Sequence, residues 1–164
     1  MTDSSASPLK WHLSPGNRRA LKRLGYGKSG VKAHLAIMRA PHYQNLLDGT
    51  KVWETRVTKV KAAPYGRVKK DDVVIWKPVG GTGHRASRVL RVVSDARAPG
   101  IGFHEDIWTT IDVMDTATRR AVEEKFNEPG YDYVTFIRVS PPIEIGEFKV
   151  QKKDSRAWVV LEAR

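Results

Sequence analysis

Short apolar runs separated by turn residues follow one another along most of the chain. Several are rich in valine, isoleucine, threonine and tryptophan, the composition typical of β-strands. The run 86–95 stays apolar at nearly consecutive positions, as expected of a buried strand. We expect strands over residues 34–39, 51–61, 72–76, 86–95, 133–139 and 157–162, with a weaker one over 143–150.

Helix signals are fewer than strand signals. The longest expected helix covers 116–126, directly after Asp115, whose carboxylate can cap the first turn. Shorter helices are expected over 17–24 and 42–48, the second of which ends at Gly49. About six strands against two or three helices, without regular β–α alternation, predict an α+β domain. We expect its sheet to be mixed or antiparallel and to curl into a small barrel.

The composition narrows the class of protein. With 164 residues, 40% of them hydrophobic and 29% charged, the chain suits one globular domain. It has no cysteine, which excludes a disulfide scaffold, Cys-ligated zinc, iron–sulfur clusters and a thiol nucleophile. Its five histidines show no metal-ligand spacing, so we expect no metal and no cofactor. The sequence contains no apolar run of membrane-span length and no secretory signal, and we expect a soluble, intracellular, cytoplasmic protein.

Positive charge is concentrated in the first two thirds of the chain. The sequence carries 29 Lys and Arg against 18 Asp and Glu, a net charge of +11. Residues 1–32 hold seven cations and one anion, residues 33–97 thirteen and five, and residues 98–164 nine and twelve. We interpret 1–32 as a basic, flexible extension of a domain spanning 33–164; a merely solubilising tail is the alternative. Nucleic acid is the first candidate partner and a membrane surface the second, because no basic amphipathic helix is visible.

Four residues around the start of the second expected strand suggest a binding site. Gly49, Lys51, Glu54 and Arg56 follow the expected helix 42–48. Glu54 and Arg56 are two apart on a strand and point to the same face, where opposite charges hold one another. Lys51 has the other parity and can join them only if the strand begins after it or carries a bulge. Two cations beside a carboxylate can hold a phosphate or a polarised carbonyl, whereas the alternative is a surface strand with an inconsequential salt bridge.

The pattern Gly-x-Lys-x-x-Glu-x-Arg, formed here by Gly49, Lys51, Glu54 and Arg56, resembles the signature of the ASCH family. The resemblance covers roughly residues 34–162. It implies a small β-barrel of the PUA-like class that binds RNA or other nucleic acid in a cleft beside the motif. It also implies that some members act as enzymes on RNA or on modified nucleosides.

The chain departs from the family pattern in two places. The turn before the third expected strand holds Asp71-Asp72, where the family more often has Gly-Asp. One enzymatic branch, an acetylcytidine amidohydrolase, carries a threonine nucleophile where this chain has Glu54, and the adjacent Thr55 points to the opposite face. A glutamate does not replace a hydroxyl nucleophile by simple analogy.

Three hypotheses about function follow. The first is an RNA-binding protein, with single-stranded RNA as the partner and DNA as the second candidate. The alternative is a hydrolase of the same fold, a ribonuclease or a nucleoside amidohydrolase, with Lys51, Glu54 and Arg56 as catalytic residues. The second alternative reads a modified base flipped out of DNA, which requires Trp76 or Trp108 to line the cleft.

The predicted RNA-binding residues are cations that attract phosphate and two aromatic residues, Tyr65 and Trp108, that are expected in loops and can stack on bases. The strand tryptophans Trp53, Trp76 and Trp158 are predicted to be core residues. The full predicted binding set is Lys51, Arg56, Lys59, Lys61, Tyr65, Arg67, Lys69, Lys70, Arg85 and Trp108, with Arg18, Arg19, Lys22 and Arg23 in the extension.

Overall fold

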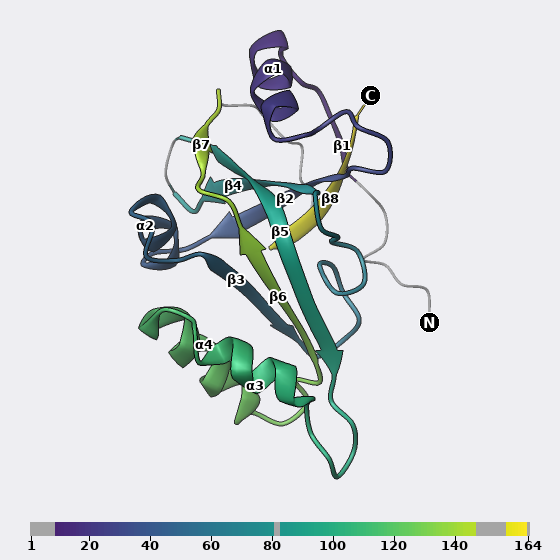
Figure 1. The fold of residues 1–164 in the computed structure, drawn as a ribbon, viewed down its shortest axis with the longest axis vertical. Helices are drawn as coiled ribbons and strands as arrows, with labels where there is room; N and C mark the ends of the chain where they lie inside the picture. Colours follow the sequence, from purple (N-terminus) through teal and green to yellow (C-terminus); the bar gives the residue numbers. More distant parts are fainter. Residues whose placement is uncertain (1–8, 81–82, 147–156, 164) are drawn as a thin grey trace.

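In the described part of the chain, a twisted β-sheet forms the centre and four helices lie around it (Figure 1). The structure, a computed structural model, describes residues 9–80, 83–146 and 157–163. The strands are β1 (Leu9–Trp11), β2 (Ala33–Met38), β3 (Trp53–Thr58), β4 (Val73–Pro78), β5 (Arg85–Ala96), β6 (Tyr133–Val139), β7 (Ile143–Glu144) and β8 (Trp158–Ala163). The helices are α1 (Pro15–Arg23), α2 (His42–Leu47), α3 (Glu105–Ile111) and α4 (Thr116–Phe126).

The sheet is mixed, and its strands run in the order β1-β8-β2-β4-β5-β6-β3, with β7 beside β5. β1 lies parallel to β8 and β2 parallel to β4, while the other pairs are antiparallel. The long strand β5 pairs with β4 at its start and with β6 beyond a register shift between Val89 and Arg91. Within the described residues no pairing joins β1 to β3, so the sheet does not close. The α+β class is confirmed, and the expected barrel is an open, curled sheet.

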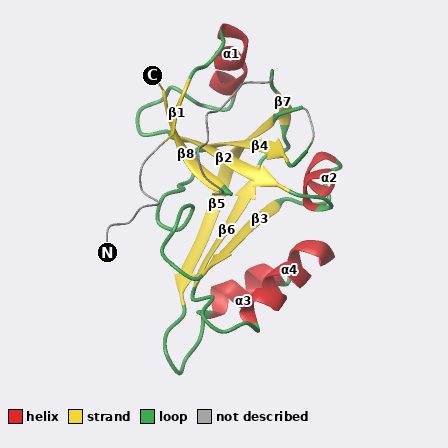
Figure 2. Cartoon of the chain, turned by 180° about the vertical axis from the view of Figure 1, so that it is seen from behind, coloured by secondary structure: helices red, strands yellow, loops and turns green. Residues whose placement is uncertain are grey.

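Three clusters of buried apolar side chains fill the interior. The first lies between α1 and the sheet and includes Leu21. The second includes Trp76 and Trp158, whose rings meet edge to face at 6.4 Å between centroids. The third includes Trp53 and Phe136 and lies between the sheet and the helices α3 and α4, which Figure 2 shows on one side of β3 and β6. The prediction that the three strand tryptophans are core residues is confirmed.

The basic N-terminal segment packs into the domain from Leu9 onward, instead of forming the flexible extension that we expected over 1–32. β1 adds a strand beside β8, and Trp11 and Leu21 are buried in the first cluster. The side chain of Asn17 donates to the carbonyl oxygen of Gly146 and accepts from its amide. The helix expected over 17–24 is present as α1, with its cations on the solvent side and its apolar residues on the sheet side.

The other helices and strands differ from expectation mainly at their boundaries. The strand expected over 51–61 begins at Trp53 and ends at Thr58. The weak strand expected over 143–150 is the short β7, and residues 147–150 lie outside the described residues. Helix α3 was not predicted, and it carries Trp108, which we expected in a loop. Across the described part of the chain, no helix is long and apolar enough to cross a membrane.

Candidate functional site

A cleft of about 370 Å³ opens between the end of β2, the start of α2, the strand β3 and the helix α4. β2, α2 and β3 follow one another in the sequence, whereas α4 comes from a distant part of the chain and lies beside β3 in Figure 1. The charged and polar residues that line the cleft include all three charged residues of the motif. The lining consists of Ile37, Met38, Arg39, His42, Lys51, Glu54, Thr55, Arg56, Val57, Ala121, Val122, Lys125 and Ala157.

The backbone between α2 and β3 places the motif at the cleft. Gly49 follows α2 with a φ of 84°, a left-handed conformation that favours glycine and reverses the chain. The Lys51 amide donates to the carbonyl oxygen of Asn45 at 2.9 Å, which holds the turn against α2. β3 begins only at Trp53, so the alternation of side chains between the two faces of a strand does not apply to Lys51. Its side chain therefore reaches the same cleft as Glu54.

Lys51 is a buried cation with a defined partner. Its side chain is 3% exposed, and its Nζ donates to Thr118 Oγ1 on α4 at 2.7 Å. Burial lowers the pKa of Lys51 and the positive charge of Arg56 lowers it further, while Glu54 and Asp115 act in the opposite direction. The ammonium group is therefore held in place by α4 and balanced by a carboxylate of the cleft.

Glu54 is a buried carboxylate between two cations. Its Oε1 accepts a hydrogen bond from the Thr55 amide at 2.7 Å, and its Oε2 lies 3.6 Å from Arg56 Nη2. Burial by itself raises the pKa of Glu54, but the charges of Lys51 and Arg56 and the Thr55 amide outweigh it, and the pKa is lowered. Glu54 thus stays ionised at neutral pH. Among the described residues, no hydrogen-bond donor reaches its Oε2.

Arg56 joins three strands at the cleft. Its Nη2 donates to the Ile37 carbonyl oxygen of β2 at 3.1 Å, and its guanidinium carbon lies 5.4 Å from the centroid of the Trp158 ring of β8. This geometry is a cation–π contact that fixes the plane of the guanidinium. In the described part of the chain its buried Nε has no acceptor, so Arg56 keeps an unused donor.

His42 and Lys125 also line the cleft, and no pattern in the sequence indicated either of them. Burial and the charge of Lys51 lower the pKa of His42, and its buried Nδ1 has no hydrogen-bond partner among the described residues. Partial burial and Arg56 lower the pKa of Lys125, which stands in the last turn of α4. Helix packing, rather than a sequence pattern, brings both side chains to the motif.

The arrangement suits an anionic or hydrogen-bonding ligand better than a metal. One buried carboxylate, Glu54, shares the lining with four cations, Arg39, Lys51, Arg56 and Lys125. Among the residues that the structure describes, no three His, Asp or Glu side chains gather to hold a metal ion. The cations can pair with phosphate or with carbonyl oxygens, and Glu54 can accept from an amino or imino group.

A second cleft of about 250 Å³ adjoins the first. It shares Arg56, Val57, Lys125 and Ala157 with the first cleft. The remaining lining residues belong to the end of β3, the segment after it and the start of β8; they are Thr58, Ala62, Ala63 and Trp158.

Three other predicted binding residues lie close to these clefts. The Nζ of Lys59 is 5.0 Å from the centroid of the Tyr131 ring, and the Nζ of Lys61 is 6.0 Å from that of Tyr133. Tyr65 meets Tyr133 edge to face at 5.1 Å between centroids. This group of cations and tyrosines follows directly on the segment that lines the second cleft.

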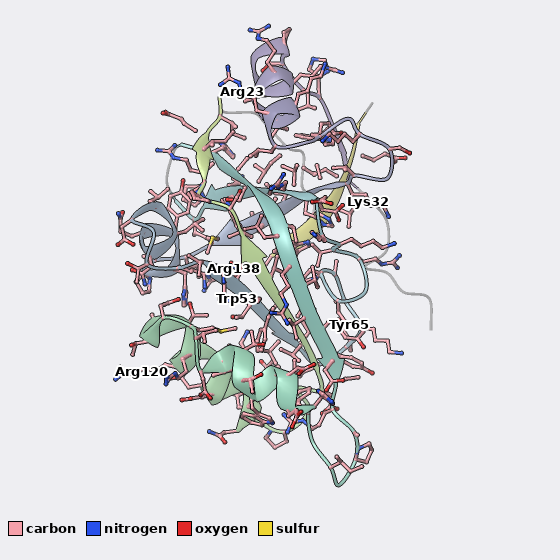
Figure 3. The ribbon with its side chains drawn as sticks, viewed as in Figure 1. Arg23, Lys32, Trp53, Tyr65, Arg120 and Arg138 are labelled. Carbon is pink, nitrogen blue, oxygen red and sulfur yellow. The ribbon has the colours of Figure 1, made fainter. Side chains whose placement is uncertain are left out.

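The structure does not bring the remaining predicted residues to the clefts. Lys69 and Lys70 are exposed in the turn before β4, and Arg67 precedes them. Arg85 begins β5 and lies 4.0 Å from Glu144. The exposed ring of Trp108 packs against Phe126 on the side of α3. The α1 cations Arg18, Arg19, Lys22 and Arg23 lie at the end of the molecule away from α4, as the labelled Arg23 and Arg120 show in Figure 3.

Comparison with known proteins finds similarity only in structure. No family model matches the sequence, and no curated protein matches it. Solved structures of an ASCH protein from Zymomonas mobilis are similar in shape. A mutant form has 11% identity and a TM-score of 0.49 over 80% of this chain and 89% of that one. The ASCH structure itself has 11% identity and a TM-score of 0.44 over 70% and 73%.

Proposed function

We propose that this protein binds single-stranded RNA, with the cleft around Glu54 and Arg56 holding one nucleotide. One observation carries the proposal: a buried, ionised carboxylate and four cations line the same cleft, whose volume is in the range of small-ligand sites. Arg56 and Lys125 contact phosphate, while Glu54 accepts a hydrogen bond from an amino or imino group of the base. The positive charge of Lys51 keeps the carboxylate of Glu54 ionised.

We favour single-stranded RNA as the ligand because a nucleotide must enter the cleft. A nucleotide enters only if its base is unstacked, and loops, ends and single strands offer such bases without the cost of opening a duplex. The cations and tyrosines beyond the second cleft, Lys59, Lys61 and Tyr65, are of the types that follow a strand by charge and stacking.

The hydrolase alternative uses the same residues and is supported by one specific observation. Glu54 presents an oxygen that no described donor occupies, as a general base or acid requires before substrate arrives. Its lowered pKa makes Glu54 a weak base, which favours a binding role over proton transfer. Thr118 does not supply a hydroxyl nucleophile, because its side chain is completely buried and bonded to Lys51.

The DNA-reader alternative is less well supported. It requires a tryptophan in the cleft, whereas Trp76 is completely buried and Trp108 lies outside the cleft lining. The indole nitrogen of Trp76 donates to Ser87 Oγ at 3.0 Å, which holds the ring in the core.

The test is the binding of a fluorescent single-stranded RNA at increasing salt. For two phosphate contacts, affinity is expected to fall about sevenfold between about 50 and 200 mM salt. Arg56→Gln is expected to weaken binding about tenfold, because a charge-assisted hydrogen bond to phosphate is lost. Arg120→Gln is the matched control, since Arg120 is exposed on α4 and does not line either cleft.

The proposal fails if affinity is independent of salt, or if Arg56→Gln and Arg120→Gln bind equally well. Incubating wild type and Glu54→Gln with RNA, followed by analysis of strand length and nucleoside composition, separates the enzyme from the binding protein. Turnover by wild type that Glu54→Gln abolishes supports the hydrolase.

A further inference from the structure

The two clefts are neighbours with a common charged wall. Arg56 and Lys125 line both of them, and Val57 and Ala157 complete the shared part. The guanidinium of Arg56 is held by Ile37 and Trp158. A ligand that crosses from one cleft to the other must therefore pass this fixed cation.

The shared wall holds two positive charges close together. Partial burial lowers the pKa of Lys125, and repulsion by the charge of Arg56, which lines the same two clefts, lowers it further. Among the described residues, Lys125 makes no ion pair, and its Nζ faces the Tyr131 ring at 5.7 Å from the centroid. An anion placed between Arg56 and Lys125 would relieve this repulsion, and a phosphodiester is such an anion.

The second cleft differs from the first in its chemistry. Beyond the shared wall it is lined mainly by apolar side chains, Ala62, Ala63 and Trp158, and carries no carboxylate. Such a wall suits the face of a base or a sugar rather than a second phosphate. The first cleft, with Glu54, can recognise hydrogen-bonding groups, whereas the second can accept any base.

The positive charge continues past the second cleft. Lys125 and Lys59 both lie within 6 Å of the Tyr131 ring, at 5.7 Å and 5.0 Å from its centroid. From Lys59 the chain leads directly to Lys61 beside Tyr133. Lys59 and Lys61 thus extend the group of cations that begins with Arg56 and Lys125.

We propose that the two clefts hold successive nucleotides of one strand, with the phosphodiester between them on Arg56 and Lys125. This inference rests on the proposed RNA-binding function and names its ligand, a strand of at least two nucleotides. The first cleft recognises one base by hydrogen bonds, and the second cleft holds the next nucleotide against its apolar wall. A free nucleoside fills only the first cleft and gains nothing from the shared wall.

The test compares fragments of increasing length by calorimetry. The probes are the four nucleoside 3′-monophosphates, dinucleoside monophosphates of all base combinations and a single-stranded RNA octamer. Wild type is expected to bind the best dinucleoside monophosphate about tenfold more tightly than the best mononucleotide, because a second base contributes its own contacts. Ala62→Trp fills the second cleft and is expected to remove this gain without changing mononucleotide binding.

Two further variants guard against misfolding and general surface effects. Lys125→Gln changes an exposed side chain and is expected to weaken the binding of the 3′-monophosphates and of the dinucleotides alike, because both place a phosphate on the shared wall. Val79→Trp introduces the same side chain as Ala62→Trp at an exposed position outside both clefts and is expected to bind like wild type.

The outcomes separate this inference from the function on which it rests. If the octamer binds but mononucleotides bind as tightly as dinucleotides, the two-nucleotide site is wrong and RNA binding stands. The same conclusion follows if Ala62→Trp retains the dinucleotide gain, or if Lys125→Gln binds dinucleotides as tightly as wild type. If neither the octamer nor any fragment binds to wild type, both proposals are wrong.

Discussion

Lys51 Nζ donates to Thr118 Oγ1 at 2.7 Å, and this buried hydrogen bond ties the segment before β3 to the first turns of α4. The two residues are 67 positions apart in the chain. The bond fixes one wall of the cleft against another, because Lys51 lines the cleft and α4 contributes Ala121, Val122 and Lys125. The geometry of the candidate site and the packing of α4 are therefore coupled.

Thr118→Val is expected to destabilise the protein by about 2 kcal/mol. The substitution keeps the volume of the side chain but leaves the buried ammonium of Lys51 without its acceptor, and an unpaired buried donor costs free energy. Urea denaturation measures the free energy of unfolding. Thr116→Val, at an exposed position of the same helix, is the control and is expected to change it by less than about 0.5 kcal/mol. Equal effects of the two substitutions would contradict the structural role of Lys51.

Glu54 is expected to make stability fall as the solution becomes acidic. Its pKa is lowered from its ordinary value of 4.5, so the folded protein binds this proton less readily than the unfolded chain. Glu54 contributes its full stabilisation at pH values above 4.5. This contribution is lost as the pH falls through the lowered pKa of Glu54 in the folded protein. Unfolding free energies measured from about pH 6 to about pH 3 are expected to decrease less steeply in Glu54→Gln than in wild type.

The exposed Glu124 provides the control for this pH profile. Glu124→Gln removes a carboxylate from the outer face of α4 and is expected to follow the wild-type profile. If Glu54→Gln also follows it, the ionised state of Glu54 does not contribute to stability.

Leu21→Ala is expected to lower the free energy of unfolding by about 3 kcal/mol, because a completely buried leucine of α1 is replaced by a cavity. The basic segment would then be part of the cooperative fold. Lys22→Ala, exposed on the same helix, is expected to have almost no effect on stability. A Leu21→Ala protein as stable as wild type would mean that α1 does not contribute to the core.

Asp71, in the turn before β4, has a backbone conformation that favours glycine. Its φ is 75°, a left-handed conformation that is unfavourable for residues with a Cβ atom. Asp71→Gly is expected to leave the melting temperature unchanged or raise it, whereas Asp71→Val is expected to lower stability by about 1 to 2 kcal/mol. Calorimetric melting of the three proteins checks this order, and a valine variant as stable as the glycine variant would overturn it.

The local signals along the sequence predicted most of the secondary structure. The helix over 116–126 was found because Asp115 caps it, with Oδ2 accepting from the Thr118 amide. Helix α3 was missed because it is short and because its cap is His104, whose Nδ1 accepts from the Asp106 amide, a role that histidine seldom takes.

The N-terminal segment shows how composition can mislead. Its charge and its Ser, Gly and Pro content suggested a flexible tail, but the four cations of α1 lie on the solvent side of that helix. Leu21 and the apolar residues beside it form the opposite side and pack against the sheet. The spacing of these apolar residues was the relevant signal, and the net charge concealed it.

For the candidate site, the motif predicted which charged residues share a cleft but not what surrounds them. Glu54 and Arg56 lie together as strand parity requires, and Lys51 joins them because β3 begins after it. His42, Thr118 and Trp158 were not foreseen as parts of the site, because each reaches it through long-range packing that leaves no pattern in the local sequence.

The position of β8 also constrains the order in which the molecule can fold. Trp158, which supports the guanidinium of Arg56 and donates from its indole nitrogen to His34 Nδ1, belongs to a strand inserted between β1 and β2. Joining Arg56 to Trp158 closes a loop of about 100 residues, a step that is entropically costly and slow. The cleft therefore cannot form early on a partly folded chain, and the ability to bind its ligand should arise only in the last stage of folding.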